Sequence, residues 1–367
     1  MISTKRSPAA DFIRILAFFL VVSVHFFLNN GYYSQIIEGK TLYVMTLMRS
    51  FFIICVPLFL TLSGYLLRRK QLEKSYYGRV WKTVITYVLA SLFCVAYSIL
   101  VLHNELSLRT IILNVFNFTA APYSWYIEMY LGLFLLIPFL NIVYNTLPSK
   151  KWKICLVITL IILTSLPSVL NIYDLNSFAW FPWPSSSSNM NKLIPAWWQS
   201  FYPITYYYLG CYLSEYPAKI NKILNVSLII FCTILSGSFC YWRSYNTTFI
   251  WGDWCGYQSL FNIALTFLVF NLLININYDK LSNGLAKFIK KVSELCLGGY
   301  LISWIFDDNF YTILLEKVPQ FTGRLAYYII IVPIVFTLSL LASYILSKMQ
   351  FLIEKLFSCL YRLFQKT

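Results

Sequence analysis

The sequence predicts an all-α polytopic membrane protein with about ten transmembrane helices and with both termini in the cytoplasm. Three observations support this fold class: the composition, the apolar stretches and the distribution of positive charge. Of 367 residues, 59% are hydrophobic and only 12% are charged, whereas soluble proteins carry about 25% charged residues. So few charged side chains cannot cover a globule of this size, and the composition therefore excludes a soluble fold.

Ten apolar stretches approach or exceed the length of about 20 residues that crosses a bilayer. The first is a retained helix rather than a signal peptide, because its apolar run is long and no small-residue cleavage site follows it. The sixth is the weakest, since it is short, rich in tyrosine and interrupted by Pro203. The stretches occupy residues 11–30, 42–67, 83–102, 125–146, 153–170, 198–213, 224–242, 257–276, 292–311 and 325–347.

Positive charge gives an independent test of the orientation. With the N-terminus inside, 21 of the 29 Lys and Arg residues fall on cytoplasmic segments, and residues 68–82 alone hold six of them. The outer segments hold six in total. This bias is what the positive-inside rule requires. The net charge of +15 is therefore explained by topology, and we expect no nucleic-acid partner.

Two domains are expected. Residues 1–347 form the membrane domain, and residues 348–367 mix apolar and basic residues at helical spacing, which predicts an amphipathic cytoplasmic tail at the interface. The longest non-apolar outer segment, 171–197, is rich in tryptophan. It is interpreted either as an aromatic belt at the headgroup level or as a platform that stacks on a sugar or lipid headgroup.

The first stretch carries Asp11, Arg14 and His25, and ionisable residues inside a membrane are costly and often functional. Arg14 and His25 are eleven residues apart, which places them on one helix face about 16 Å apart. Asp11 lies one turn before Arg14 and can pair with it. Histidine can take a proton near neutral pH, and arginine binds phosphate. The alternatives are a merely hydrogen-bonded histidine and an arginine that reaches the interface.

The second stretch ends in Ser63-Gly64, a small pair that allows close approach of another helix. It continues into a basic segment that could bind the phosphates of a coenzyme or, alternatively, anionic lipid. Its relevant residues are Arg68, Arg69, Arg79 and Lys82.

Other polar residues give weaker signals. Glu128 follows Trp125 and Tyr126 near the outer face and could contact a sugar hydroxyl. Asp307 and Asp308, by contrast, are expected to face water. The cysteines and the two histidines show no metal-ligand spacing, so we expect no metal site.

Segments along nearly the whole chain resemble the acyltransferase-3 family of integral-membrane O-acyltransferases. The first is the D-x-x-R pattern at Asp11 and Arg14, followed by His25 eleven residues after the arginine. The others are similar to further family segments in the same order: 56–67, 76–82, 125–138 and 297–302.

This resemblance implies a membrane enzyme that moves an acyl group, most often acetyl from acetyl-CoA, to a hydroxyl of a cell-surface or lipid-linked glycan. It implies a cell-membrane location, His25 as general base and a catalytic set completed by Arg14 and Asp11. Acyl-CoA would be held by Arg14, Arg68, Arg69, Arg79 and Lys82, and the acceptor by Trp125, Tyr126 and Glu128.

One departure concerns the late segment, which usually ends in histidine and here has Ser303, so that His25 would act without a second histidine. The main rival function is a transporter or flippase for a lipid-linked polysaccharide, in which His25 and Glu128 line a proton path. The internal repeats of many transporters are absent from the sequence. The acceptor, the acyl chain and the oligomeric state are left open.

Overall fold

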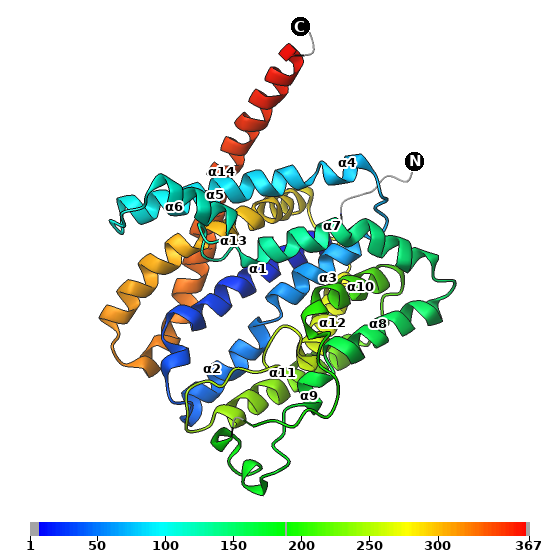
Figure 1. The fold of residues 1–367 in the computed structure, drawn as a ribbon, viewed down its shortest axis with the longest axis vertical. Helices are drawn as coiled ribbons and strands as arrows, with labels where there is room; N and C mark the ends of the chain where they lie inside the picture. The colour runs from blue at the N-terminus through cyan, green and yellow to red at the C-terminus, as the bar shows by residue number, and fades with distance from the viewer. Residues whose placement is uncertain (1–6, 188, 365–367) are drawn as a thin grey trace.

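The computed structural model describes residues 7–187 and 189–364, which fold into α-helices with connections of varied length (Figure 1). Within these residues the only β pairing is a single bridge between Ile37 and Tyr245, so the all-α prediction is confirmed. The α-helices are α1 (Pro8–Asn29), α2 (Gly39–Phe52), α3 (Cys55–Leu67), α4 (Lys74–Tyr77), α5 (Val80–Leu100), α6 (Leu108–Phe116), α7 (Trp125–Thr146), α8 (Lys150–Thr164), α9 (Pro167–Leu170), α10 (Tyr202–Glu215), α11 (Lys222–Ser244), α12 (Leu260–Ile274), α13 (Asn283–Lys317) and α14 (Tyr328–Phe364).

Every predicted apolar stretch contains a helix, but two of the stretches are broken. Stretch 42–67 forms α2 and α3, which are separated at Ile53 and Ile54, and stretch 153–170 forms α8 and the short α9. Helices α8, α10 and α12 are short, with 15, 14 and 15 residues. In the described part of the chain, six helical segments have the length and composition to cross a membrane: Pro8–Ser34, Gly39–Leu67, Lys74–Leu100, Trp125–Thr146, Lys222–Ser244 and Phe321–Lys355.

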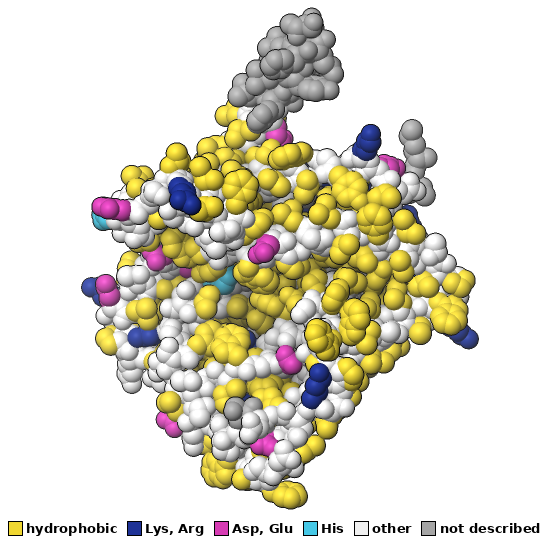
Figure 2. All heavy atoms as spheres, viewed as in Figure 1, with side chains coloured by type: hydrophobic (Ala, Val, Ile, Leu, Met, Phe, Trp, Pro, Cys, Tyr) yellow, Lys and Arg dark blue, Asp and Glu magenta, His cyan; other side chains and the backbone are white. Residues whose placement is uncertain are grey.

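The surface agrees with a membrane protein. Figure 2 shows hydrophobic side chains over much of one face, with few charged side chains among them. On α7, for example, Leu135, Leu136 and Phe139 are each about half exposed. Such a surface is stable next to lipid rather than water. The chain is therefore an all-α membrane protein.

The predicted tail is helical up to Phe364 and is part of α14. Helix α14 continues into it without a break, and Figure 1 shows this part extending away from the other helices. The described residues do not include 365–367 of the predicted tail. They also do not include Lys5 and Arg6, which belong to the 21 positive residues assigned to cytoplasmic segments.

Helix α1 packs against α13, α3, α14 and α2, and two hydrogen bonds fix its direction relative to α13. Ser293 bonds to Asp11 and Asp307 bonds to His25, and each pair is separated by 282 residues. The two contacts occur in the same order along both helices, and they lie about 21 Å apart along each helix at a rise of 1.5 Å per residue. Helices that meet in the same order at both points must run parallel. The ends of α1 thus each have their own partner on α13.

Helices α3 and α10 cross at two glycines, as the Ser63-Gly64 pair predicted for α3. A Cβ atom added to Gly64 would lie 1.8 Å from the carbonyl oxygen of Tyr207, and one added to Gly210 would lie 1.9 Å from that of Thr61. Both distances are far below van der Waals contact, so the two backbones touch directly. This crossing positions α3, which lines the cavity described below.

Candidate active site

His25 and Asp307 form a buried pair between α1 and α13. Nδ1 of His25 lies 3.2 Å from Oδ2 of Asp307, and the aspartate is only 1% exposed. The sequence-based expectation that Asp307 faces water was therefore wrong. The parallel packing of α13 on α1 buries this aspartate opposite the histidine, whereas its neighbour Asp308 accepts a hydrogen bond from Tyr97.

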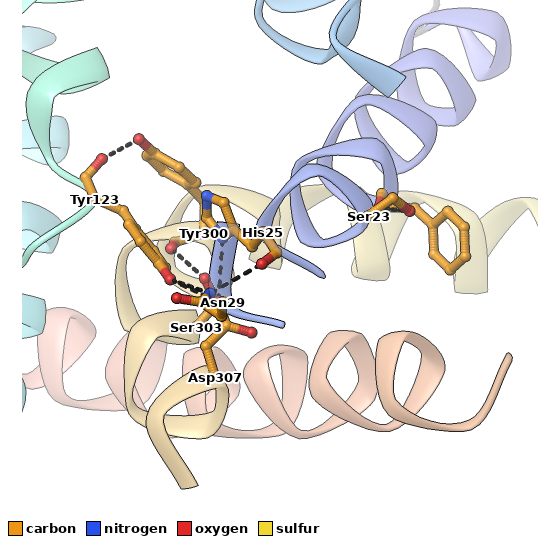
Figure 3. Close-up of polar contacts among 8 residues, drawn as sticks. Ser23, His25, Asn29, Tyr123, Tyr300, Ser303 and Asp307 are labelled. Carbon is orange, nitrogen blue, oxygen red and sulfur yellow. Dashed lines mark hydrogen bonds and ion pairs between the residues drawn. The ribbon is translucent and has the colours of Figure 1, made fainter. Parts of the chain in front are cut away.

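Two further side chains complete the polar cluster around His25 (Figure 3). The hydroxyl of Tyr123 donates to Oδ2 of Asp307 over 2.9 Å, and Nδ2 of Asn29 donates to that hydroxyl over 3.0 Å. The rings of His25 and Tyr123 are in contact, with their centroids 3.7 Å apart. The cluster joins α1, α13 and the segment that precedes α7. Sequence reasoning missed both Tyr123 and Asn29.

Arg14 is held at the other end of the α1–α13 contact. The predicted pair with Asp11 is present at 3.3 Å. Arg14 also donates to the hydroxyl of Ser293 over 2.5 Å, and that hydroxyl donates to Asp11 over 2.7 Å. Asp11 and Ser293 thus fix one edge of the guanidinium. The Arg14 side chain remains 27% exposed, so it can still bind a ligand.

A cavity of about 250 Å³ connects the level of Arg14 with the region below His25. Along α1 it extends from Arg14 to Val21, which lies one turn before His25, and Tyr126 and Tyr300 also line it. Its walls are mostly apolar side chains of α3, α7 and α13, with Leu62, Leu66, Leu67 and Leu297 among them. Arg14 is the one charged residue in this lining.

Aromatic contacts connect the cavity lining with the residues around His25. The hydroxyl of Tyr300 donates to the carbonyl oxygen of Tyr123, and the rings of Tyr126 and Tyr300 meet edge to face. His25 is not among the lining residues, but its ring contacts Tyr123, which accepts the hydrogen bond from Tyr300.

Besides Arg14, the basic residues predicted to bind acyl-CoA divide into two groups. Arg68 forms an ion pair with Glu215 at the end of α10, and the same carboxylate accepts a hydrogen bond of 2.7 Å from Lys153. Arg69, Arg79 and Lys82 are exposed. The structure thus leaves these three available to a ligand and gives Arg68 a partner that sequence reasoning missed.

Glu215 lies beyond the predicted sixth span. Its partial burial favours the neutral acid, but the hydrogen bond from Lys153 and the charge of Arg68 together hold the pKa of this carboxyl below its usual range. The carboxylate is therefore the stable form at neutral pH, and it ties α3, α8 and α10 together at one end.

The predicted acceptor-binding residues do not all face the same space. Tyr126 lines the cavity, and Trp125 stacks on Tyr257 with ring centroids 5.5 Å apart. Glu128 is exposed, on the α7 face that also carries Leu135. The helix therefore directs Trp125 and Tyr126 towards protein neighbours and Glu128 away from the cavity.

Replacement of Glu215 by glutamine is expected to lower the free energy of unfolding by about 1–2 kcal/mol, because Arg68 and Lys153 lose a partly buried counter-charge. Because the folded pKa is lowered, this stabilisation is complete above the ordinary glutamate pKa and is lost as the pH falls through the lowered value. The loss of stability and its dependence on pH are measured by thermal unfolding of the purified variants at pH 7 and at acidic pH. The exposed Glu105→Gln is the control, and equal melting temperatures for the two variants would contradict the prediction.

Comparison with protein-family models gives one match, described as "Acyltransferase domain", over residues 8–347. No curated protein and no solved structure matches the chain significantly. The matched region includes all of the polar cluster and the cavity.

Proposed function

The chain belongs to the acyltransferase-3 family, whose domain model covers residues 8–347, and from this premise we propose that it transfers an acetyl group from acetyl-CoA to a hydroxyl of a cell-surface or lipid-linked glycan. The observation that carries the proposal is the cavity between Arg14 and the region of His25. One end offers a cation for phosphate, and the other lies within one helical turn of a base.

The donor enters from the cytoplasm in this proposal. Arg14 binds a phosphate of acetyl-CoA through charge-assisted hydrogen bonds, while Arg69, Arg79 and Lys82 provide positive charge at the entrance. Arg68 acts there mainly through its ion pair with Glu215. The apolar walls of the cavity suit the uncharged arm of the coenzyme, since they exclude water from the thioester.

His25 acts as the general base. It takes the proton of the acceptor hydroxyl as the hydroxyl oxygen attacks the thioester carbonyl carbon. The new C–O bond forms, the C–S bond breaks, and the imidazolium returns the proton to the departing thiolate. Trp125 and Tyr126 hold the acceptor sugar by stacking, whereas Glu128, which is directed away from the cavity, has no role in this step.

We also propose the topology that this reaction needs, with ten spans, both termini cytoplasmic and the protein in the cell membrane. The parallel direction of α1 and α13 supports it, because these helices hold the first and ninth apolar stretches, which must both run outward. A cytoplasmic donor can then modify an acceptor on the outer face.

The test is to supply radiolabelled acetyl-CoA to membranes from cells with and without this protein. We expect alkali-labile label in the glycan fraction only when the protein is present, because an O-acetyl ester is cleaved by mild base. Movement of a lipid-linked glycan across the membrane without consumption of the thioester would contradict the proposal and favour a transporter.

Replacement of Arg14 by glutamine is expected to raise the KM for acetyl-CoA about 10- to 100-fold, since hydrogen bonds to charged groups contribute about 1.5–3 kcal/mol. Initial rates over a range of acetyl-CoA concentrations measure this effect. Arg109→Gln, at an exposed position of α6, is the matched control. An unchanged KM in the Arg14 variant would remove this residue from the donor site.

A further inference from the structure

The carboxylate of Asp307 receives two hydrogen bonds on a single oxygen. Oδ2 is 3.2 Å from Nδ1 of His25 and 2.9 Å from the hydroxyl of Tyr123. The aspartate is 1% exposed and the histidine 8%. A buried carboxylate is costly unless donors compensate for the lost hydration, so this arrangement needs a reason beyond packing.

We propose that Asp307 is a positioning residue that fixes the tautomer and the ring orientation of His25, with Tyr123 and Asn29 supporting it. This inference rests on the proposed function, because it assigns the group that prepares the base of that reaction. It gives a role to a residue whose position at the end of an apolar stretch suggested exposure to water.

The direction of the hydrogen bonds determines the tautomer. In this proposal Asp307 is ionised and can only accept, so Nδ1 of His25 carries the hydrogen and Nε2 carries the lone pair. The hydroxyl of Tyr123 accepts from Asn29 over 3.0 Å, which leaves its own hydrogen for Asp307. Asn29 thus donates to Tyr123 and Tyr123 donates to Asp307, so that both hydrogen bonds are directed towards the carboxylate.

The same carboxylate stabilises the charge that forms during the reaction. When Nε2 takes the proton of the acceptor hydroxyl, the ring becomes an imidazolium that lies next to the Asp307 carboxylate. Inside the protein this interaction is less screened than in water, and it is lost again when the imidazolium gives its proton to the thiolate. Histidine–aspartate pairs in hydrolases act in this way.

Ser303 does not fill this role. It lies one turn before Asp307 on α13, but its hydroxyl donates to the carbonyl oxygen of Tyr300 over 2.9 Å. The aspartate is thus the side chain of α13 that contacts the imidazole, and Figure 3 shows it beneath the His25 ring.

The experiment compares Asp307→Asn with Asp308→Asn, the same substitution at the adjacent residue. We expect Asp307→Asn to lower kcat about 100-fold or more with the KM for acetyl-CoA changed less than about twofold, because an amide can donate to Nδ1 and favour the wrong tautomer. Asp308→Asn should remain near wild type, and Asp307→Glu should recover part of the lost kcat. Equal kcat values for the two asparagine variants would overturn the proposal.

A second measurement does not depend on turnover. Diethyl pyrocarbonate reacts with an unprotonated imidazole nitrogen, and the chain has only two histidines, so exposed His103 is an internal reference for mass spectrometry. We expect the ratio of His25 to His103 modification to fall at least tenfold in Asp307→Asn. An unchanged ratio would overturn the tautomer assignment, whereas a wild-type protein that transfers no acetyl group would overturn only the proposed function.

Discussion

Replacement of His25 by alanine is expected to lower acetyl transfer about 10³-fold while leaving the affinity for acetyl-CoA within about twofold, because general-base catalysis contributes roughly 10²–10⁴ in rate. In the proposed site the donor is held mainly through Arg14, which lies about three helical turns from His25 on α1. The measurement combines single-turnover transfer rates with equilibrium binding of labelled acetyl-CoA to the purified protein.

The alanine variant also leaves Asp307 buried without its histidine partner, so loss of activity could follow from a damaged fold. His25→Asn addresses this, because its amide can still donate to the carboxylate but cannot serve as a base. We expect both variants to be inactive and the asparagine variant to melt close to wild type. His103→Ala controls for histidine loss at an exposed site. Substantial transfer by His25→Asn would exclude the general-base role.

The sequence was informative where the bilayer itself imposes the pattern. Lipid requires apolar helices with satisfied backbones, so each apolar stretch found in the sequence contains a helix. In the described part of the chain, six helical segments have the length and composition to cross a membrane. The pairing of Asp11 with Arg14 was also accessible, because it depends only on helical spacing. Such local regularities do not depend on which helices pack together.

The partners contributed by other helices could not be predicted in this way. Ser293 and Asp307 are each 282 residues from the α1 residues that they contact, and nothing in a single sequence indicates the packing of α1 on α13. One signal was available for Asp307, since it falls within the apolar stretch 292–311. An ionisable residue there has a high cost next to lipid and therefore predicts a buried partner.

Arg68 shows a second limit of prediction from the sequence. A run of basic residues after a span suggested one phosphate-binding group, but the side chains point to different neighbours. Arg68 meets Glu215, which the short and weakly apolar α10 brings beside α3. The close crossing of these two helices, which the sequence indicated only through Gly64, therefore decides which cations remain free for a ligand.

That crossing also gives the largest expected effect on stability. Replacement of Gly64 or Gly210 by alanine places a methyl group less than 2 Å from a backbone carbonyl oxygen of the partner helix. A backbone atom inside a helix cannot rotate away as a side chain can, so α3 and α10 must separate. We expect either variant to lose more than about 3 kcal/mol of stability, which corresponds to a melting temperature roughly 6–12 °C lower.

The control for this prediction is Gly132→Ala in α7, where an added Cβ meets no atom within 4 Å. In a helix interior this change should be neutral or stabilising, so it separates steric overlap from the loss of a glycine. Fluorescence-detected size-exclusion chromatography and thermal unfolding in detergent measure all three variants. Gly64→Ala behaving like Gly132→Ala would show that α3 and α10 do not touch. The variant that carries both Gly64→Ala and Gly210→Ala gives a further test. Once one methyl group has separated the helices, the second has room. The double variant should therefore lose much less stability than the sum of the two single losses.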